Sequence, residues 1–317
     1  MRDHERGKTI SVVVPCYNDE QVLGQLVGRL KPVLDSSSFP WEILLVNDGS
    51  RDETWRTILE LGQREERVRG IDLSRNFGHQ IAVTAGLDFC EGDCAVVMDS
   101  DLQDPPELIP ELLKKWQEGF EIVYAVHEER QDSFLKRLGA GAFYWLLKKL
   151  SGTPLPHQAG DFRLMGRPVV EALRRIRERH RYIRGLTFWT GFKTASVSYT
   201  RTQSLRGGSG YTFKKLVRLG MDAIASFSVI PLRISFFIGL FIFILSIVCA
   251  ALIIFFKIFY GIPYRGWTSL FVGLTFFSGV QLLVLGVLGE YMGRIYEEVK
   301  GRPLYFIQDV LRVETKY

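Results

Sequence analysis

Residues 96–107 read VVMDSDLQDPPE: an apolar run ends abruptly in an acidic cluster, and a Pro-Pro pair follows. With Cys94 and Ala95, the apolar run is typical of a buried parallel strand, because such a strand is covered on both faces and tolerates continuous apolar sequence. Asp99 and Asp101 would then lie at the carboxyl end of that strand, where open α/β sheets bind their ligands. An Asp-x-Asp pair can hold a divalent cation through oxygen ligands, although the same pair also occurs in ordinary solvated turns.

Strand and helix signals alternate on both sides of this stretch. We expect strands at residues 9–15, 41–46, 68–73, 94–98 and 121–126, helices at 20–34, 53–65, 80–89 and 107–118, and later strands at 162–165 and 194–199. Such alternation indicates βαβ units around a parallel sheet. The predicted fold class is therefore α/β with a Rossmann-like, mainly parallel sheet.

Two long uncharged stretches follow the α/β part, at residues 234–256 and 266–289. Each exceeds the roughly 20 residues that cross a hydrocarbon core. A buried helix hairpin in a soluble protein is the alternative, and two such runs side by side disfavour it. We therefore expect two transmembrane helices.

Basic residues lie mainly outside this pair of spans. The connection 257–265 carries only Lys257 and Arg265, whereas the flanks carry Lys214, Lys215, Arg218, Arg233, Arg294, Lys300, Arg302, Arg312 and Lys316. Because cytoplasmic flanks are enriched in Lys and Arg, both termini are expected in the cytoplasm. Residues 1–8 are polar and charged, which disfavours a secretory signal, and the four cysteines lack zinc-site spacing and are expected to be free thiols.

Two further segments, 133–150 and 211–230, mix aromatic and aliphatic residues with Lys and Arg. Helices of this kind can lie in a membrane interface with their cations toward lipid phosphates. An ordinary helix packed on the domain is the alternative. We expect interfacial placement because the two spans keep the domain near the membrane.

Polar clusters also follow the other predicted strands, at residues 15–20, 47–54 and 72–79. Each cluster alone could be a turn or a helix cap. Because neighbouring parallel strands place their carboxyl ends at one edge of the sheet, the recurrence predicts a single ligand site. The histidines are expected to be structural or exposed, because no metal-ligand spacing connects His79, His127, His157 and His180. The sequence has no Gly-rich P-loop, so it does not indicate ATP hydrolysis.

Three motifs carry a family resemblance: PxYNxE at 15–20, NDGSxDxT at 47–54 and DxDLQDPPE at 99–107. They resemble the signatures of family-2 glycosyltransferases with a GT-A fold. The most similar subset is the polyisoprenyl-phosphate glycosyltransferases, especially the bactoprenol glucosyltransferases, which are related to dolichol-phosphate mannose synthases. GDFRL at 160–164, the lead-in at 226–233 and the tail at 289–303 match this subset too, so the resemblance covers nearly the whole chain.

The resemblance implies a metal-dependent donor site. Its nucleotide-sugar contacts would be Pro15, Tyr17, Glu20, Asp48, Asn76 and Asp99, with Asp48 accepting from the base. Asp99, Asp101 and Gln103 would hold Mg²⁺ or Mn²⁺ against the diphosphate, where the metal neutralises charge on the departing nucleoside diphosphate. Asp101 is thus expected to be catalytic. Asp161 is expected to be catalytic too, as a base or as a group that orients the acceptor. The alternative for Asp161 is a structural hydrogen-bonding role.

The implied acceptor is a lipid phosphate, which is already an anion and needs cations more than a strong base. The candidate phosphate-binding residues are Arg130, Arg137, Arg201 and Arg206. Contact with lipid headgroups is the alternative for each. Relatives often carry R-x-x-G-x-S-x-Y in the later loop, whereas this chain has Ser204 at the arginine position and Arg206 two residues on, so which arginine serves there stays open.

The resemblance thus implies transfer of a hexose, glucose from UDP-glucose as first choice, to undecaprenyl phosphate, with inversion, at the cytoplasmic face of the cell membrane. GDP-mannose or a UDP-linked amino sugar is the alternative donor, and a non-catalytic nucleotide-sugar-binding scaffold is the alternative function. A processive polysaccharide synthase is disfavoured because the chain lacks a Q-x-x-R-W motif. No nucleic-acid partner is expected, and small residues such as Gly273, Ser278 and Gly279 in the second span favour a homo-oligomer.

The expected domain organisation follows from these segments. Residues 1–210 would form the cytoplasmic GT-A domain, 211–231 an interfacial helix, 232–290 a two-helix transmembrane hairpin, and 291–317 a cytoplasmic tail.

Overall fold

The computed structural model describes residues 8–127, 159–199 and 266–313, together with scattered positions between 232 and 259. The chain divides into two units. The first unit comprises residues 1–145, 153–212 and 302–317, and the second unit comprises residues 146–152 and 213–301.

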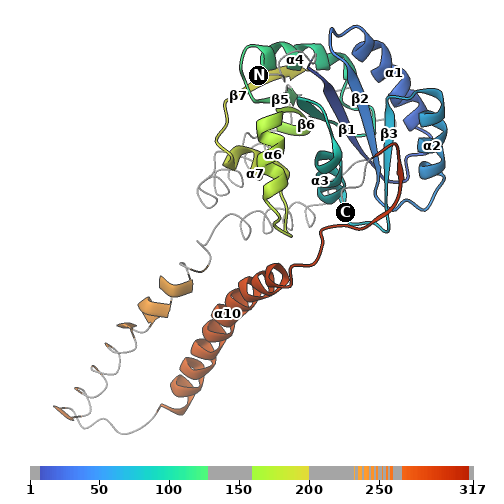
Figure 1. Ribbon diagram of the computed structural model, residues 1–317. Helices are drawn as coiled ribbons and strands as arrows, with labels where there is room; N and C mark the ends of the chain where they lie inside the picture. Colours follow the sequence, from blue (N-terminus) through green and yellow to red (C-terminus); the bar gives the residue numbers. More distant parts are fainter. Residues whose placement is uncertain are drawn as a thin grey trace. The chain divides into compact units, whose positions relative to one another are not determined.

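A sheet of order β7-β5-β6-β4-β1-β2-β3-β8 forms the centre of the first unit (Figure 1). Its strands are β1 (Ile10–Cys16), β2 (Trp41–Asn47), β3 (Val68–Leu73), β4 (Cys94–Val97), β5 (Ile122–His127), β6 (Ala159–Gly166), β7 (Thr194–Tyr199) and β8 (Ile307–Leu311). The pairs β1–β2, β2–β3, β1–β4 and β5–β7 are parallel, whereas β6 and β8 pair antiparallel with their neighbours. This confirms the α/β class with a mainly parallel sheet.

Helices cover both faces of this sheet (Figure 1). They are α1 (Leu23–Asp35), α2 (Thr54–Arg64), α3 (His79–Phe89), α4 (Ile109–Gln117), α6 (Arg167–Arg175) and α7 (Ile183–Trp189), and a 3-10 turn at Pro106–Leu108 leads into α4. Val12 of β1 belongs to a buried cluster with Leu26 of α1 and Leu112 of α4. Its neighbour Val13 points to the opposite face, as alternation along a strand requires, and there it meets α3.

The contact between α3 and β1 depends on a glycine. A Cβ atom at Gly86 would lie 2.2 Å from Val13 Cγ1 and 3.2 Å from Val46 Cγ2. Only a residue without a side chain therefore lets α3 lie this close to the sheet. The close packing matters for the site because α3 begins at His79, at the carboxyl edge of the parallel strands.

The strand order reverses at β1, which lies between β2 and β4. The chain proceeds from β1 to β2 and β3 on one side, then returns to place β4 on the other side. Such a reversal opens a crevice at the carboxyl ends of the strands, the usual binding position in open α/β sheets. The polar clusters after β1, β2, β3 and β4 all lie at this edge.

The segment after residue 301 rejoins the first unit as an edge strand. β8 pairs antiparallel with β3, the main-chain N–H of Ser74 donates to Phe306 O at 2.9 Å, and Tyr305 Oη donates to Asp88 Oδ2 at 2.7 Å. From the sequence we expected residues 291–317 to form a tail, and we predicted none of β8, α6 and α7. All three owe their positions to packing against elements that are distant in the sequence.

The second unit contains α10 (Trp267–Val299). In the part of the chain that the structure describes, α10 is the helix that is long and apolar enough to cross a membrane, with a candidate span at residues 276–299 that contains an 18-residue window of mean hydropathy 1.4. The first expected span, 234–256, is described only at scattered positions, and the segments 133–150 and 211–230 lie outside the described residues. The two-span hairpin and the interfacial helices therefore stay predictions.

Candidate active site

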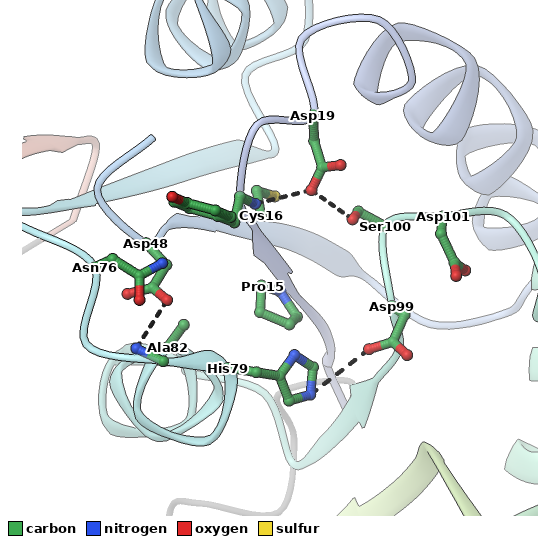
Figure 2. A pocket seen from close by; sticks show the side chains of 12 residues that line it. Pro15, Cys16, Asp19, Asp48, Asn76, His79, Ala82, Asp99, Ser100 and Asp101 are labelled. Atoms are coloured by element: carbon green, nitrogen blue, oxygen red, sulfur yellow. Dashed lines mark hydrogen bonds and ion pairs between the residues drawn. The ribbon is translucent and has the colours of Figure 1, made fainter. Parts of the chain in front are cut away.

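A cavity of about 340 Å³ lies at the carboxyl ends of β1, β2 and β4 (Figure 2). Six of the predicted site residues line it: Pro15, Tyr17, Asp48, Asn76, Asp99 and Asp101. Pro15 comes from the end of β1, and the loops after β1, β2, β3 and β4 supply the others. The structure thus brings together the residues that the separate motifs singled out, and their roles remain proposals.

Glu20 and Gln103 are not among the residues that line the cavity. Glu20 Oε2 accepts a hydrogen bond from the main-chain N–H of Glu53 at 2.9 Å. Gln103 is buried, and its main-chain N–H donates to Asp101 Oδ1 at 3.1 Å. Both residues therefore shape the loops that carry the lining residues.

Asp48 joins the loops after β2 and β3. Its Oδ1 accepts from the main-chain N–H of Phe77 at 2.7 Å, and its Oδ2 accepts from the main-chain N–H of Gly78 at 2.9 Å. Burial raises the pKa of Asp48, and the two N–H donors offset part of that rise. Each carboxylate oxygen keeps a second lone pair, so Asp48 can also accept a hydrogen bond from a ligand.

The same two loops are in backbone contact at Gly49. This residue has φ +61°, and a Cβ atom on it would lie 2.2 Å from the main-chain carbonyl carbon of Arg75. Glycine is therefore required in the motif Asn47-Asp48-Gly49-Ser50 both for its conformation and for this close approach. The approach holds Asn76 at the cavity.

Asp19 ties the loops after β1 and β4 together. It accepts from the main-chain N–H of Tyr17 at 2.8 Å and from Ser100 Oγ at 2.7 Å (Figure 2). Its own N–H donates to Thr54 Oγ1 at 2.8 Å. The wall that carries Tyr17 is thus fixed to the loop that carries the two metal-ligand candidates Asp99 and Asp101.

A second cluster joins His79, Asp99 and Asp161. His79 Nε2 lies 3.6 Å from Asp99 Oδ1 and 3.7 Å from Asp161 Oδ2. The three residues come from the start of α3, the loop after β4 and strand β6. Sequence spacing did not single out His79 for a site because its two partners belong to other elements.

Asp161 is held by two arginines. Arg163 Nη2 lies 2.8 Å from Asp161 Oδ1, and Arg184 donates through Nε to Oδ1 at 3.1 Å and through Nη2 to Oδ2 at 2.9 Å. Burial acts to raise the pKa of Asp161, but the charges of Arg184 and Arg163 hold it well below its usual range. Asp161 is therefore a carboxylate at neutral pH and a weak proton acceptor.

The oxygens of Asp99 and Asp101 fit a hard divalent cation. Asp99 Oδ1 is buried and receives no hydrogen bond, and burial raises the pKa of Asp99 to about 6. A cation would supply the positive charge that this oxygen lacks. His79, Asp99 and Asp161 also present ligand atoms within 4.8 Å of one another, but the arginines already engage both oxygens of Asp161. We therefore take Asp99 and Asp101, which both line the cavity, as the candidate pair of cation ligands.

Cys16 lines the cavity without being a candidate nucleophile or metal ligand. It is a buried free thiol, and burial raises its pKa to about 12. Cys90 and Cys94 are likewise free and buried, as expected.

The four predicted acceptor-phosphate residues, Arg130, Arg137, Arg201 and Arg206, lie outside the described residues. Sequence reasoning missed His79, Arg163 and Arg184. A signal existed for Arg163, because Asp161 and Arg163 are two residues apart in a strand and so share one face of the sheet. No local signal connects Arg184 to Asp161.

Comparisons with known proteins agree on one family. The sequence profile described as "Glycosyl transferase family 2" matches residues 11–174. The chain is 44% identical over 307 residues to the uncharacterized glycosyltransferase YkcC of Bacillus subtilis, covering 96% of this chain and 95% of that protein. It is 41% identical over 300 residues to the SfII prophage-derived bactoprenol glucosyl transferase of Shigella flexneri, covering 94% of this chain and 97% of that protein.

Among solved structures, the chain is similar to glucosyl-3-phosphoglycerate synthase from Mycobacterium tuberculosis in complex with Mn²⁺, UDP-glucose and phosphoglyceric acid. The TM-score is 0.46 at 19% sequence identity, and the match covers 69% of this chain and 78% of that chain.

Proposed function

The chain belongs to glycosyltransferase family 2, and from this premise we propose that it transfers glucose from UDP-glucose to undecaprenyl phosphate with inversion at the anomeric carbon. One observation carries the proposal: the 41% identity to a bactoprenol glucosyl transferase extends over nearly the full length of both chains. It therefore includes the unit with the cavity and the apolar helix α10. Both parts suit transfer to an acceptor that lies in a membrane.

The cavity at the strand ends would take the nucleotide. Asp48 would accept a hydrogen bond from the base, beside Tyr17, whose side chain is exposed at the cavity. Asp99 and Asp101 would hold Mg²⁺ or Mn²⁺ against the diphosphate, with Gln103 supporting Asp101 through its main-chain N–H. The bound cation supplies neutralisation of the charge that develops on the departing UDP.

The acceptor phosphate needs no proton removed before it attacks. One of its anionic oxygens forms the new bond to the anomeric carbon, and the bond between that carbon and the UDP oxygen breaks on the opposite face. We assign Asp161 to orientation of the reacting groups, since its arginine partners make it a weak base. Arg130, Arg137, Arg201 and Arg206 remain the proposed phosphate-binding cations.

We further propose that the enzyme is anchored in the cell membrane by α10 and the span at 234–256, with the first unit on the cytoplasmic side. The Lys and Arg residues that flank the expected spans support this orientation. The four-part organisation 1–210, 211–231, 232–290 and 291–317 and a homo-oligomeric state belong to the same proposal.

A donor panel tests the proposal. The purified full-length protein is offered labelled UDP-glucose, GDP-mannose or a UDP-linked amino sugar with undecaprenyl phosphate and Mg²⁺ or Mn²⁺. We expect labelled lipid from UDP-glucose alone. Lipid product from another donor alone would support that donor instead, and binding of UDP-glucose without any transfer would support the scaffold alternative.

A variant pair separates catalysis from donor binding. Asp101→Ala should abolish transfer while UDP-glucose still binds in the cavity. Asp35→Ala is the matched control, because Asp35 contacts Trp41 and Arg67 near the amino end of β2, away from the cavity. It should transfer glucose at the wild-type rate.

A further inference from the structure

We propose that Arg184 is a positioning residue of the transfer reaction and that it acts by holding Asp161 beside His79 and Asp99. The inference rests on the proposed function, because it concerns the transfer step at the same site. Arg184 carries no motif in the sequence and lies on α7, a helix that the sequence did not predict. The contacts that α7 makes with β6 and α3 support this role.

Arg184 grips Asp161 at two points. Its Nε lies 3.1 Å from Oδ1 and its Nη2 lies 2.9 Å from Oδ2, a fork that fixes the plane of the carboxylate. The neighbouring main-chain N–H of Ile183 donates to Gln80 Oε1 at 2.9 Å, which ties the start of α7 to the start of α3. Because α3 begins at His79, the same few residues position His79 and the fork together.

The two arginines on Asp161 do different work. Arg163 is buried and contacts only Oδ1 of the carboxylate, while its Nη1 contacts Thr187 Oγ1 at 3.4 Å. Oδ2 is the oxygen that faces His79, and Arg184 is the arginine that holds it. The direction of Oδ2 therefore depends on Arg184.

The charges around Asp161 indicate that Arg184 positions this carboxylate and contributes little to the stability of the fold. Asp161 already balances the buried charge of Arg163, so removal of Arg184 leaves a complete buried ion pair. Arg184 itself is about one-third exposed at its side chain, at 35%. Its loss should thus release Oδ2 of Asp161 without leaving an unpaired buried charge.

A double-mutant cycle tests this inference in the full-length protein. Arg184→Gln, Asp161→Asn and the double variant are compared for kcat, for KM of undecaprenyl phosphate and for the Kd of UDP. We expect Arg184→Gln to lose about 10²-fold in kcat, the scale of a misplacement near 1 Å, with the Kd of UDP unchanged. The double variant should transfer no more slowly than Asp161→Asn alone, because Arg184 acts through Asp161.

Arg177→Gln is the matched control. Arg177 also forms an ion pair with an aspartate of α3, with Nη1 at 2.7 Å from Asp88 Oδ2, and Asp88 is not one of the residues that line the cavity. It should keep wild-type kinetics. If Arg184→Gln does not fold, Arg184→Lys replaces it in the cycle, because lysine keeps the charge but not the two-point grip.

Two results would overturn the positioning role: wild-type kcat in the Arg184 variant, or multiplicative losses in the double variant. Either of these, in a protein whose wild type transfers glucose, removes this inference and leaves the proposed function standing. A wild type that transfers no sugar from any donor removes the proposed function, and this inference with it.

Discussion

Replacing Gly49 by alanine should disable nucleotide binding through a clash between two main chains. The added Cβ would lie 2.2 Å from the carbonyl carbon of Arg75 and 2.5 Å from the nitrogen of Asn76. Carbon atoms in contact are ordinarily about 3.5 Å apart, so the loops must separate by roughly 1 Å. Neither neighbour is a flexible side-chain end that could move aside, and the loop that carries Asn76 must shift.

That shift would break the anchor at Asp48. Its hydrogen bonds from the N–H groups of Phe77 and Gly78 measure 2.7 and 2.9 Å, and an added separation near 1 Å exceeds hydrogen-bonding distance. Hydrogen bonds to a charged group contribute about 1.5–3 kcal/mol each to stability. We expect a Kd for UDP that is weaker by about 10²-fold, together with a lower unfolding temperature, because the cavity wall itself is displaced.

Calorimetric titration with UDP and thermal unfolding measure the two effects. Gly191→Ala is the matched control, because Gly191 has φ +72° with nothing within 4 Å of its Cβ position. It should lose only the conformational term of about 1–2 kcal/mol and bind UDP normally. Gly49→Asn tolerates the positive φ but keeps the clash, so it should bind UDP as weakly as Gly49→Ala does. Normal UDP affinity in Gly49→Ala would refute the reasoning, and restored affinity in Gly49→Asn would attribute the effect to φ alone.

Three further outcomes are expected. Phe306→Ala should raise the KM for the donor, since its ring packs on Phe77 in the loop after β3 and such aromatic contacts contribute about 0.5–1.5 kcal/mol. Leu311→Ala, in β8 just after Phe306, should lower only the unfolding temperature. Gly86→Ala should destabilise the fold, because overpacking against Val13 costs about 1–3 kcal/mol and alanine regains only about 1 kcal/mol of helix propensity. Gly28→Ala is the control, because its Cβ position is open and the variant should gain the helix propensity alone. Equal thermal unfolding midpoints for the two variants would contradict this. Mn²⁺ at a concentration of one hundred times its Kd should stabilise the wild type against unfolding by about 2.7 kcal/mol, and EDTA should abolish transfer. Equal stabilisation of Asp101→Ala by Mn²⁺ would exclude the proposed metal site.

The donor side of the site could be predicted from local patterns. β1, β2 and β4 are mainly apolar, β3 also contains Arg69 and Asp72, and polar residues follow each strand within two positions. Parallel pairing carries those polar residues to one edge. Pro15, Tyr17, Asp48 and Asp99 therefore meet in one cavity although each was identified separately. The family followed from the same motifs and is confirmed by the relatives.

The region around Asp161 could not be predicted in the same way. Asp161 was a candidate from its motif, but its role was open between base, orienting group and structural residue. Its arginine fork comes from residue 184, on a short helix whose start is fixed by Gln80. The two arginines decide its charge, and through it the assignment to orientation.

The amino-acid sequence was sufficient for properties that depend on neighbours along the chain. These are the strand–helix alternation, the acidic strand ends at Asp48 and Asp99, and an apolar stretch of spanning length now seen in α10. Only the tertiary structure decided which charged side chains lie next to one another and which hydrogen-bond donors they contact. Segments far apart in sequence meet where His79 lies beside Asp99, where Arg184 contacts Asp161 and where β8 pairs with β3. Burial and electrostatic interactions depend on distances of a few ångströms in space and not on separation along the chain.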